Sequence, residues 1–254
     1  MSVEFVSADQ VAHAAACEAP LRLVDTFGRV ARDLRVSLTD RCNLRCSYCM
    51  PPEGLDWLPT EETLTDAEVV RLVRIGVERL GIRQVRFTGG EPLLRRGLEG
   101  IIAECSQLRT DEGQTPDLAL TTNALGLAKR AQGLRDAGLD RVNISLDSLD
   151  REHYAAITRR DRLDDVLEGI EAAARAGLSP IKVNTLVLRG MNEADLPDLV
   201  DYCLDRGIEL RVIEQMPIGP VDTWDRQNIL TADEILHIMG TRHTLDPAQR
   251  EDPH

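Results

Sequence analysis

The stretch Cys42-Asn43-Leu44-Arg45-Cys46-Ser47-Tyr48-Cys49 carries three of the chain's six cysteines within eight residues. Thiolates this close together on a loop converge on a soft metal centre, either zinc or an iron–sulfur cluster. A structural zinc ion needs four protein ligands, and no fourth cysteine or suitably spaced histidine lies nearby. Three thiolates instead predict a four-iron cluster with one iron open to a chelating small molecule. The alternatives are an incomplete zinc site or three cysteines that merely share a loop.

The composition favours a small-molecule partner. The 254 residues approach the size of one α/β barrel, and 30 basic against 43 acidic residues give a net charge of −13. This charge argues against nucleic acid and against anionic membranes as partners. No apolar run reaches the roughly 18 residues of a membrane span, and no signal-peptide pattern opens the chain. We therefore expect a cytoplasmic protein whose reduced cysteines bind metal.

Strand and helix patterns alternate downstream of residue 30. The expected strands are 34–39, 84–88, 117–121, 141–146, 181–188 and 208–214. One helix opens at Thr65, with Glu68 in a capping box, and closes at Gly81; a second runs from Leu163 to Gly177. Further helices fit 95–108, 125–137 and 193–206. Six such units predict a parallel sheet, either doubly wound or curved into a partial barrel.

The strand faces separate these two architectures. A doubly wound sheet buries both faces and has continuous apolar strands, whereas these strands alternate, as in Leu34-Arg35-Val36-Ser37-Leu38. Since side chains alternate across a strand, the polar face must line a lumen. The sequence therefore predicts an α/β fold of the partial (βα)6 TIM-like barrel type.

The predicted lumen face carries four cations, Arg35, Arg86, Lys182 and Arg211. Concentrating positive charge there is costly unless an anionic guest lies among these side chains. The alternative is that each cation belongs to a buried ion pair, with Asp147 and Glu214 as the nearby acids.

Two motifs together resemble the radical S-adenosylmethionine (SAM) superfamily. They are the C-x3-C-x2-C spacing with Tyr48 before the third cysteine, and Thr88-Gly89-Gly90-Glu91-Pro92 at the end of the second strand. Glycines at a strand's carboxyl end let a ligand approach the backbone closely. The resemblance implies a [4Fe-4S] cluster whose open iron takes the amine and carboxylate of SAM.

Several longer runs are similar to the GTP 3′,8-cyclase family of molybdenum cofactor (molybdopterin) biosynthesis: 32–42, 86–96, 120–123, 143–147, 182–184 and 214–219. This resemblance implies that the cluster is held by Cys42, Cys46 and Cys49. It implies that SAM is contacted by Tyr48, Gly90, Ser145 and Met216. It implies that GTP is contacted by Arg35, Arg86, Thr121 and Lys182, with Arg211 near the phosphates.

The implied activity is that of a radical SAM lyase. One cluster electron cleaves SAM to methionine and a 5′-deoxyadenosyl radical, which removes the ribose 3′ hydrogen of GTP; the carbon radical then adds to guanine C8. Cluster-bound SAM carries this chemistry, so no side chain is assigned as the catalytic nucleophile. The protein orients its guests and excludes water.

The resemblance fails at the C-terminal end. The family holds a second cluster on three more cysteines, which this sequence lacks up to His254. We therefore expect one cluster, an N-terminal extension at 1–30, a radical SAM core at 31–222 and the start of a truncated segment at 223–254. Whether such a chain turns over GTP, and whether the truncation is natural, are left open.

Three isolated positions complete the departures from the family. Cys105 and Cys203 lack cluster spacing and are expected to be packing residues. Gln84 stands where relatives carry a basic residue, which predicts weaker phosphate affinity.

The expected partners are GTP and, as the next enzyme of the pathway, cyclic pyranopterin monophosphate synthase. A homodimer is an alternative to a monomer, and the sequence does not identify the reductant. Two other functions compete with the cyclase: a different radical SAM enzyme, such as one that modifies peptides, and a noncatalytic module that binds a cluster, SAM or a nucleotide.

Overall fold

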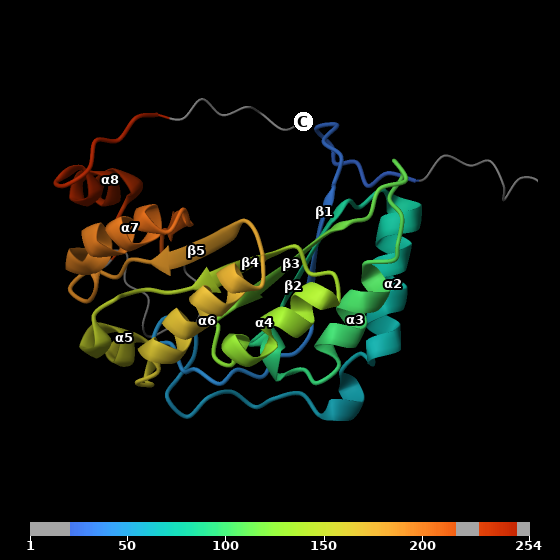
Figure 1. The fold of residues 1–254 in the computed structure, drawn as a ribbon, viewed down its shortest axis with the longest axis horizontal. Helices are drawn as coiled ribbons and strands as arrows, with labels where there is room; N and C mark the ends of the chain where they lie inside the picture. Colours follow the sequence, from blue (N-terminus) through green and yellow to red (C-terminus); the bar gives the residue numbers. More distant parts are fainter. Residues whose placement is uncertain (1–20, 217–228, 248–254) are drawn as a thin grey trace, which may run out of the picture.

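The computed structural model describes residues 21–216 and 229–247, which form six strands and seven α-helices (Figure 1). The strands are β1 (Asp33–Ser37), β2 (Gln84–Thr88), β3 (Asp117–Thr122), β4 (Arg141–Ser145), β5 (Ile181–Leu186) and β6 (Glu209–Ile213). The helices are α2 (Asp66–Leu80), α3 (Leu98–Cys105), α4 (Leu127–Asp136), α5 (Arg151–Thr158), α6 (Leu163–Arg175), α7 (Leu196–Asp205) and α8 (Ala232–Gly240). All six predicted strands are therefore confirmed, with ends within two residues of those expected.

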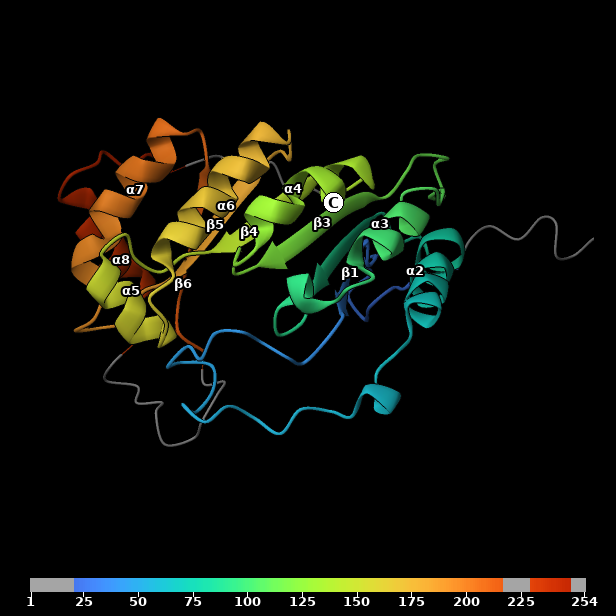
Figure 2. The same cartoon turned by 60° about the horizontal axis from the view of Figure 1, so that its bottom comes forward.

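The strands form one parallel sheet in the order β1-β2-β3-β4-β5-β6, so each strand pairs with the next along the chain. Helices α2, α3, α4, α6 and α7 run along one side of the sheet, as Figure 2 shows. No pairing among the described residues joins the edge strands β1 and β6. The sheet is therefore open, which confirms the predicted partial (βα)6 TIM-like barrel.

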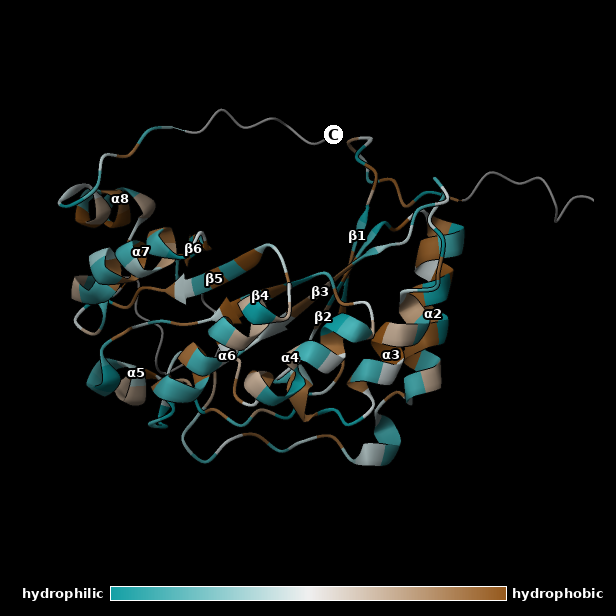
Figure 3. Ribbon diagram, viewed as in Figure 1, coloured by the Kyte–Doolittle hydropathy of each residue, from teal (hydrophilic) through white to brown (hydrophobic). Residues whose placement is uncertain are grey.

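The hydrophobic core lies between the sheet and these helices. Alternate strand residues such as Val85, Phe87 and Val142 are completely buried there. Figure 3 shows the matching pattern on the helices, which carry hydrophobic residues along one side and hydrophilic residues along the other. Because Arg86 lies between Val85 and Phe87 in the strand, it points to the opposite face, which lines the lumen.

The two helix limits predicted most sharply are confirmed. Thr65 caps α2 through a capping box with Glu68, and Gly81 ends the helix with a φ of 75°. Gly177, also with a φ of 75°, follows α6. Left-handed φ values favour glycine, which explains why both helices end there.

Two helices were not anticipated from the sequence. α5 is only eight residues long and is capped by Asp150, whose side chain accepts from the amides of Glu152 and His153. α8 packs Ile235 into a small cluster that also contains Val187 of the chain after β5. Among the described helices, none combines the length and apolar character that crossing a membrane requires. Much of 1–30 and 223–254 lies outside the described residues, so the domain limits remain predictions.

Candidate functional site

The three loop cysteines line one cavity of about 220 Å³ at the carboxyl end of the sheet. Its other walls include Thr88, Thr121 and Ser145, which end or nearly end β2, β3 and β4. We call this cavity, with Cys42, Cys46 and Cys49, the cysteine mouth. All three thiols are free, and among the described residues no three metal-ligating side chains converge on a single ion. In a four-iron cluster each thiolate binds a different iron, so such a donor set does not have to converge on one ion.

Because the three thiols are partly buried, their ionisation depends on a positively charged centre nearby. Desolvation raises the pKa of Cys46 to about 12 and raises the pKa values of Cys42 and Cys49. Such thiols are neutral at pH 7 without a metal, and a bound iron would deprotonate them outright. The donor set and its burial therefore fit an iron–sulfur cluster.

The end of α5 holds the cysteine loop in place. The amides of Arg45 and Ser47 donate to the carbonyls of Thr158 (3.1 Å) and Ile157 (2.8 Å). Arg159 adds two hydrogen bonds from one guanidinium nitrogen, to the carbonyls of Arg45 and Met50, each 2.9 Å. Sequence reasoning missed this support because both α5 and the role of Arg159 depend on tertiary contacts.

Gly89 and Gly90 line the mouth, and on the side where a Cβ would lie their backbone packs against the chain at Thr39 and Arg41. The amide of Gly90 donates to the Thr39 carbonyl at 2.6 Å. A Cβ at Gly89 would lie 2.3 Å from that oxygen, and one at Gly90 would lie 2.3 Å from the Arg41 carbonyl. Glycine is thus required at both positions for loop packing, and the expected approach of a ligand to this backbone stays a prediction.

Glu91 is a second residue whose role the sequence did not reveal. Its fully buried carboxylate accepts from the amides of Leu93 (2.9 Å) and Asn123 (2.7 Å) and from the Thr122 hydroxyl (2.7 Å). The Asn123 side chain in turn donates to Asn43 Oδ1 at 2.8 Å. Burial raises the pKa of Glu91, and these donors oppose that rise. Glu91 therefore ties β2 and β3 to the cysteine loop.

A second cavity, of about 350 Å³, adjoins the cysteine mouth and shares Tyr48, Cys49, Thr121, Ser145 and Asp147 with it. Three of the four predicted SAM contacts line this cavity: Tyr48, Ser145 and Met216, the last being 58% exposed. The Tyr48 hydroxyl donates to Asp147 at 2.9 Å. Burial raises the pKa of Asp147 to about 6, against the hydrogen bonds from the Leu186 amide and Tyr48.

Strand register brings the four predicted cations onto one face. Arg35 pairs with Arg86 across β1 and β2, and Asn184 pairs with Arg211 across β5 and β6. We call Arg35, Arg86, Lys182 and Arg211 the cation layer. Three of its members lie two residues before a side chain that lines the cavities: Thr88, Asn184 and Ile213. Two residues of strand span about 7 Å, so the layer lies one step deeper in the lumen.

The members of this layer differ in their partners. Lys182 Nζ and Arg211 Nε bind the two carboxylate oxygens of Glu209 at 2.6 and 2.7 Å. Arg86 Nε is buried without a hydrogen-bond partner in the described part of the chain. Burial, followed by the charge of exposed Arg35, lowers the pKa of Arg86. An anionic guest would satisfy this donor.

The ion-pair alternative holds for Lys182 and Arg211, but through Glu209, and the two acids named for it, Asp147 and Glu214, have other partners. Asp147 accepts from Tyr48 and Leu186, and Glu214 accepts from the amide of Ala232. The acid beside Lys182 and Arg211 is instead Glu209. It lies on the same face of the sheet, because it is the partner of Lys182 in the register of β5 with β6.

Arg141 is a lumen cation that sequence reasoning passed over. It pairs in register with Ala119, which pairs with Arg86, so it shares their face. Its guanidinium binds Asp117 through Nε and Nη2, the shortest distance being 2.7 Å, and reaches Gln84 Oε1 at 3.2 Å.

The buried cysteines Cys105 and Cys203 are confirmed as packing residues, with exposures of 0% and 1%.

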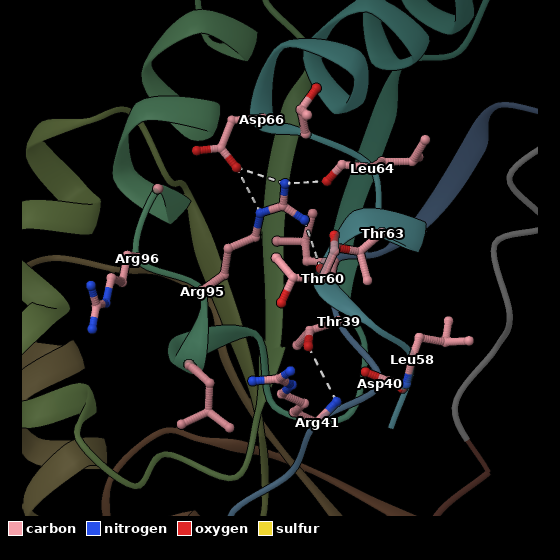
Figure 4. A pocket seen from close by; sticks show the side chains of 14 residues that line it. Thr39, Asp40, Arg41, Leu58, Thr60, Thr63, Leu64, Asp66, Arg95 and Arg96 are labelled. Carbon is pink, nitrogen blue, oxygen red and sulfur yellow. Dashed lines mark hydrogen bonds and ion pairs between the residues drawn. The ribbon is translucent and has the colours of Figure 1, made fainter. Parts of the chain in front are cut away.

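A further cavity of about 450 Å³ is lined by Thr39–Arg41 together with residues around Asp66 and Arg95, as Figure 4 shows. Arg95 organises it by donating to the carbonyls of Leu38 and Leu64, each at 2.7 Å, and by pairing with Asp66. This cavity contains none of the cysteines or lumen cations, and we assign it no chemistry.

Known proteins resemble the chain at two levels. Residues 36–203 match the Radical SAM superfamily. The chain is 63% identical over 227 residues to a GTP 3′,8-cyclase of Corynebacterium glutamicum, covering 89% of this chain and 60% of that protein. It is 56% identical over 230 residues to a GTP 3′,8-cyclase of Mycobacterium marinum, covering 90% and 63%. The chain thus spans about three fifths of the length of these relatives.

Solved structures agree on the fold alone. Streptococcus suis SuiB bound to S-adenosylmethionine superposes with a TM-score of 0.54 at 20% identity, over 72% of this chain and 40% of that one. Native anSMEcpe with bound AdoMet gives a TM-score of 0.58 at 18% identity, over 72% and 51%.

Proposed function

This chain belongs to the radical SAM superfamily, and we propose that it converts GTP to its 3′,8-cyclised form in molybdenum cofactor biosynthesis. The observation that carries the proposal is the cation layer, which lies deeper in the lumen than the two cavities and in which the buried Nε of Arg86 has no acceptor among the described residues. The names of the relatives from C. glutamicum and M. marinum support the same substrate.

The cysteine mouth fits the cofactors of the superfamily. Cys42, Cys46 and Cys49 would hold one [4Fe-4S] cluster, and the second cavity would take SAM against Tyr48, Ser145 and Met216, with Gly90 at the wall of the mouth. When bound, the cluster and SAM supply the radical that begins the reaction. Asp147 would fix the hydroxyl of Tyr48 toward that cavity.

The chain's own residues bind and orient the nucleotide. Arg35 and Arg86 present guanidinium forks that match phosphate oxygens in pairs, and Lys182 adds a point charge. Arg211 would lie near these phosphates, and Thr121, which lines both cavities, would also contact the nucleotide. Holding the ribose against bound SAM would orient the two for reaction and keep competing hydrogen donors away.

The proposal extends to the organisation of the chain and its pathway. It takes 31–222 as the radical SAM core, preceded by an extension at 1–30 and followed by a further segment from 223. The cyclised product would pass to cyclic pyranopterin monophosphate synthase. This chain covers 60–63% of the length of these relatives, so turnover of GTP by this chain is itself part of the proposal.

Anaerobic reconstitution with iron, sulfide, dithionite, SAM and GTP tests the proposal. We expect about four irons per chain, together with 5′-deoxyadenosine and 3′,8-cyclised GTP in equal amounts. Replacing GTP with an uncharged nucleoside should abolish the cyclised product. Deoxyadenosine without any cyclised nucleotide would overturn the cyclase and favour another radical SAM reaction. Absence of both products, with iron and GTP bound, would favour a noncatalytic module.

A further inference from the structure

Glu209 binds two members of the cation layer at once. One carboxylate oxygen lies 2.6 Å from Lys182 Nζ and the other 2.7 Å from Arg211 Nε. No other hydrogen bond to this carboxylate is found among residues 21–216 and 229–247. Glu209 thus forms ion pairs, through its single negative charge, with two of the cations that we assign to the phosphates of the nucleotide.

The position of Glu209 allows it to leave. It begins the edge strand β6, and its side chain is 48% exposed. Lys182 is only 14% exposed, so its ammonium needs a counterion whether or not Glu209 supplies one. The carboxylate can therefore rotate into solvent only when another anion takes its place.

We propose that Glu209 is an internal competitor of the substrate's phosphates: it neutralises Lys182 and Arg211 until a polyphosphate displaces it. This inference rests on the proposed function and adds a specificity-determining residue to it. A weakly charged ligand would not offset the two lost ion pairs, whereas a triphosphate offers several charges and more acceptor oxygens. Glu209 therefore selects for polyphosphate over singly charged guests.

The ionisation of Glu209 agrees with this role. Partial burial would raise its pKa, but hydrogen bonds from Lys182 and Arg211 outweigh burial and lower the pKa. The carboxylate is therefore fully charged at neutral pH, where it competes with phosphate as an anion.

Binding of inorganic triphosphate, measured by titration calorimetry at fixed salt, tests the inference without a cluster or SAM. We expect Glu209→Gln to tighten the Kd about five-fold, the scale of one weak ion pair. Asp33→Asn is the matched control. Asp33 shares the lumen face, since it pairs in register with Gln84, but it has no ion pair among the described residues. Its charge acts on Arg86 without an ion pair, so its loss should change the Kd less than about two-fold.

A double-mutant cycle separates displacement from a general charge effect. In the Lys182→Met, Arg211→Met background, Glu209→Gln has no cation to release, so its gain should fall to the level of Asp33→Asn. Glu209→Asp, whose shorter side chain cannot reach both cations, should give an intermediate gain. Circular dichroism of each variant checks that it is folded.

Two outcomes would overturn the inference, and they are distinguishable. Equal gains for Glu209→Gln and Asp33→Asn, or a gain that survives in the Lys182→Met, Arg211→Met background, would mean that Glu209 acts only through long-range charge. The proposed function would then stand. Failure of the wild type and every variant to bind triphosphate would contradict the proposed function itself, and the competitor role with it.

Discussion

The cysteine mouth and the cation layer belong to the same lumen, with the layer deeper than the mouth, yet they are built differently. The mouth is surrounded by protein hydrogen bonds: Glu91 accepts three of them, and Arg159 donates two to the cysteine loop. In the cation layer, Arg86 has a buried donor with no acceptor among the described residues, and Lys182 relies on half-exposed Glu209.

This difference separates a preformed site from one completed by its guest. A cofactor that stays bound needs ligands held in position beforehand, so the frame of the mouth is satisfied within the protein. A substrate that enters and leaves needs charges that are not already neutralised by strong, buried partners. We therefore expect changes at the mouth to alter stability and iron content, and changes in the cation layer to alter anion affinity.

The largest effect should come from the cysteines. Cys42→Ala, Cys46→Ala and Cys49→Ala should each lose most of their iron after anaerobic reconstitution, because two thiolates cannot hold the cluster. Cys105→Ala is the matched control: it should keep about four irons per chain, although the small cavity it leaves costs about 1 kcal/mol of unfolding free energy. Iron analysis and urea denaturation measure the two effects. Equal iron loss in Cys105→Ala would remove the distinction between mouth and core.

The next effect should come from the frame of the mouth. Glu91→Gln replaces an acceptor by an amide that faces three donors, so it should lower the unfolding free energy of the metal-free protein by about 2 kcal/mol. It should also speed the loss of iron, since Asn123 links Glu91 to Asn43. Glu104→Gln, at an exposed site on α3, should change neither quantity. Unchanged urea denaturation of Glu91→Gln would show that the frame is not held by this carboxylate.

Arg86 should show the opposite behaviour. Arg86→Met removes a donor that has no acceptor among the described residues, so the unfolding free energy should change by less than about 0.5 kcal/mol. Triphosphate affinity should fall about ten-fold or more, the value of one charge-assisted pair. Arg141→Met is the control, because it strands Asp117 and should lower stability more than affinity. A stability loss at Arg86 equal to that at Arg141 would make both residues structural.

The features that could be predicted from the sequence are those with local signals, and the features that were missed depend on contacts between distant parts of the chain. Two local signals were sufficient to locate the mouth and the cation layer. They are the spacing of the cysteines and the alternation of polar with apolar residues around Arg35 and Arg86. Glu209 carried the same alternation signal as Arg211, but its partner Lys182 depends on the register of β5 against β6. Arg159 looked like one of many surface arginines, and its contact with the cysteine loop spans more than a hundred residues of chain.

The smallest effect should come from α5, the helix whose end holds the cysteine loop. Its His153 Nδ1 lies 2.8 Å from Asp195 Oδ2. The hydrogen bond to Asp195, with the nearby charges of Asp150 and Glu152, raises the pKa of His153 above 6.5. Its stabilising contribution is therefore complete below the unfolded value of about 6.5 and is lost as pH rises through the folded pKa.

We expect His153→Gln to destabilise the protein at pH 5.5 and to have almost no effect at pH 8.5, as measured by urea midpoints. The exposed His237, without an ion pair among the described residues, provides the control, because His237→Gln should shift both midpoints alike. If His153→Gln also had the same effect at both pH values, the His153 and Asp195 pair would not anchor α5 by charge. The support of the cysteine loop would then rest on the hydrogen bonds of Arg159 and of the α5 backbone.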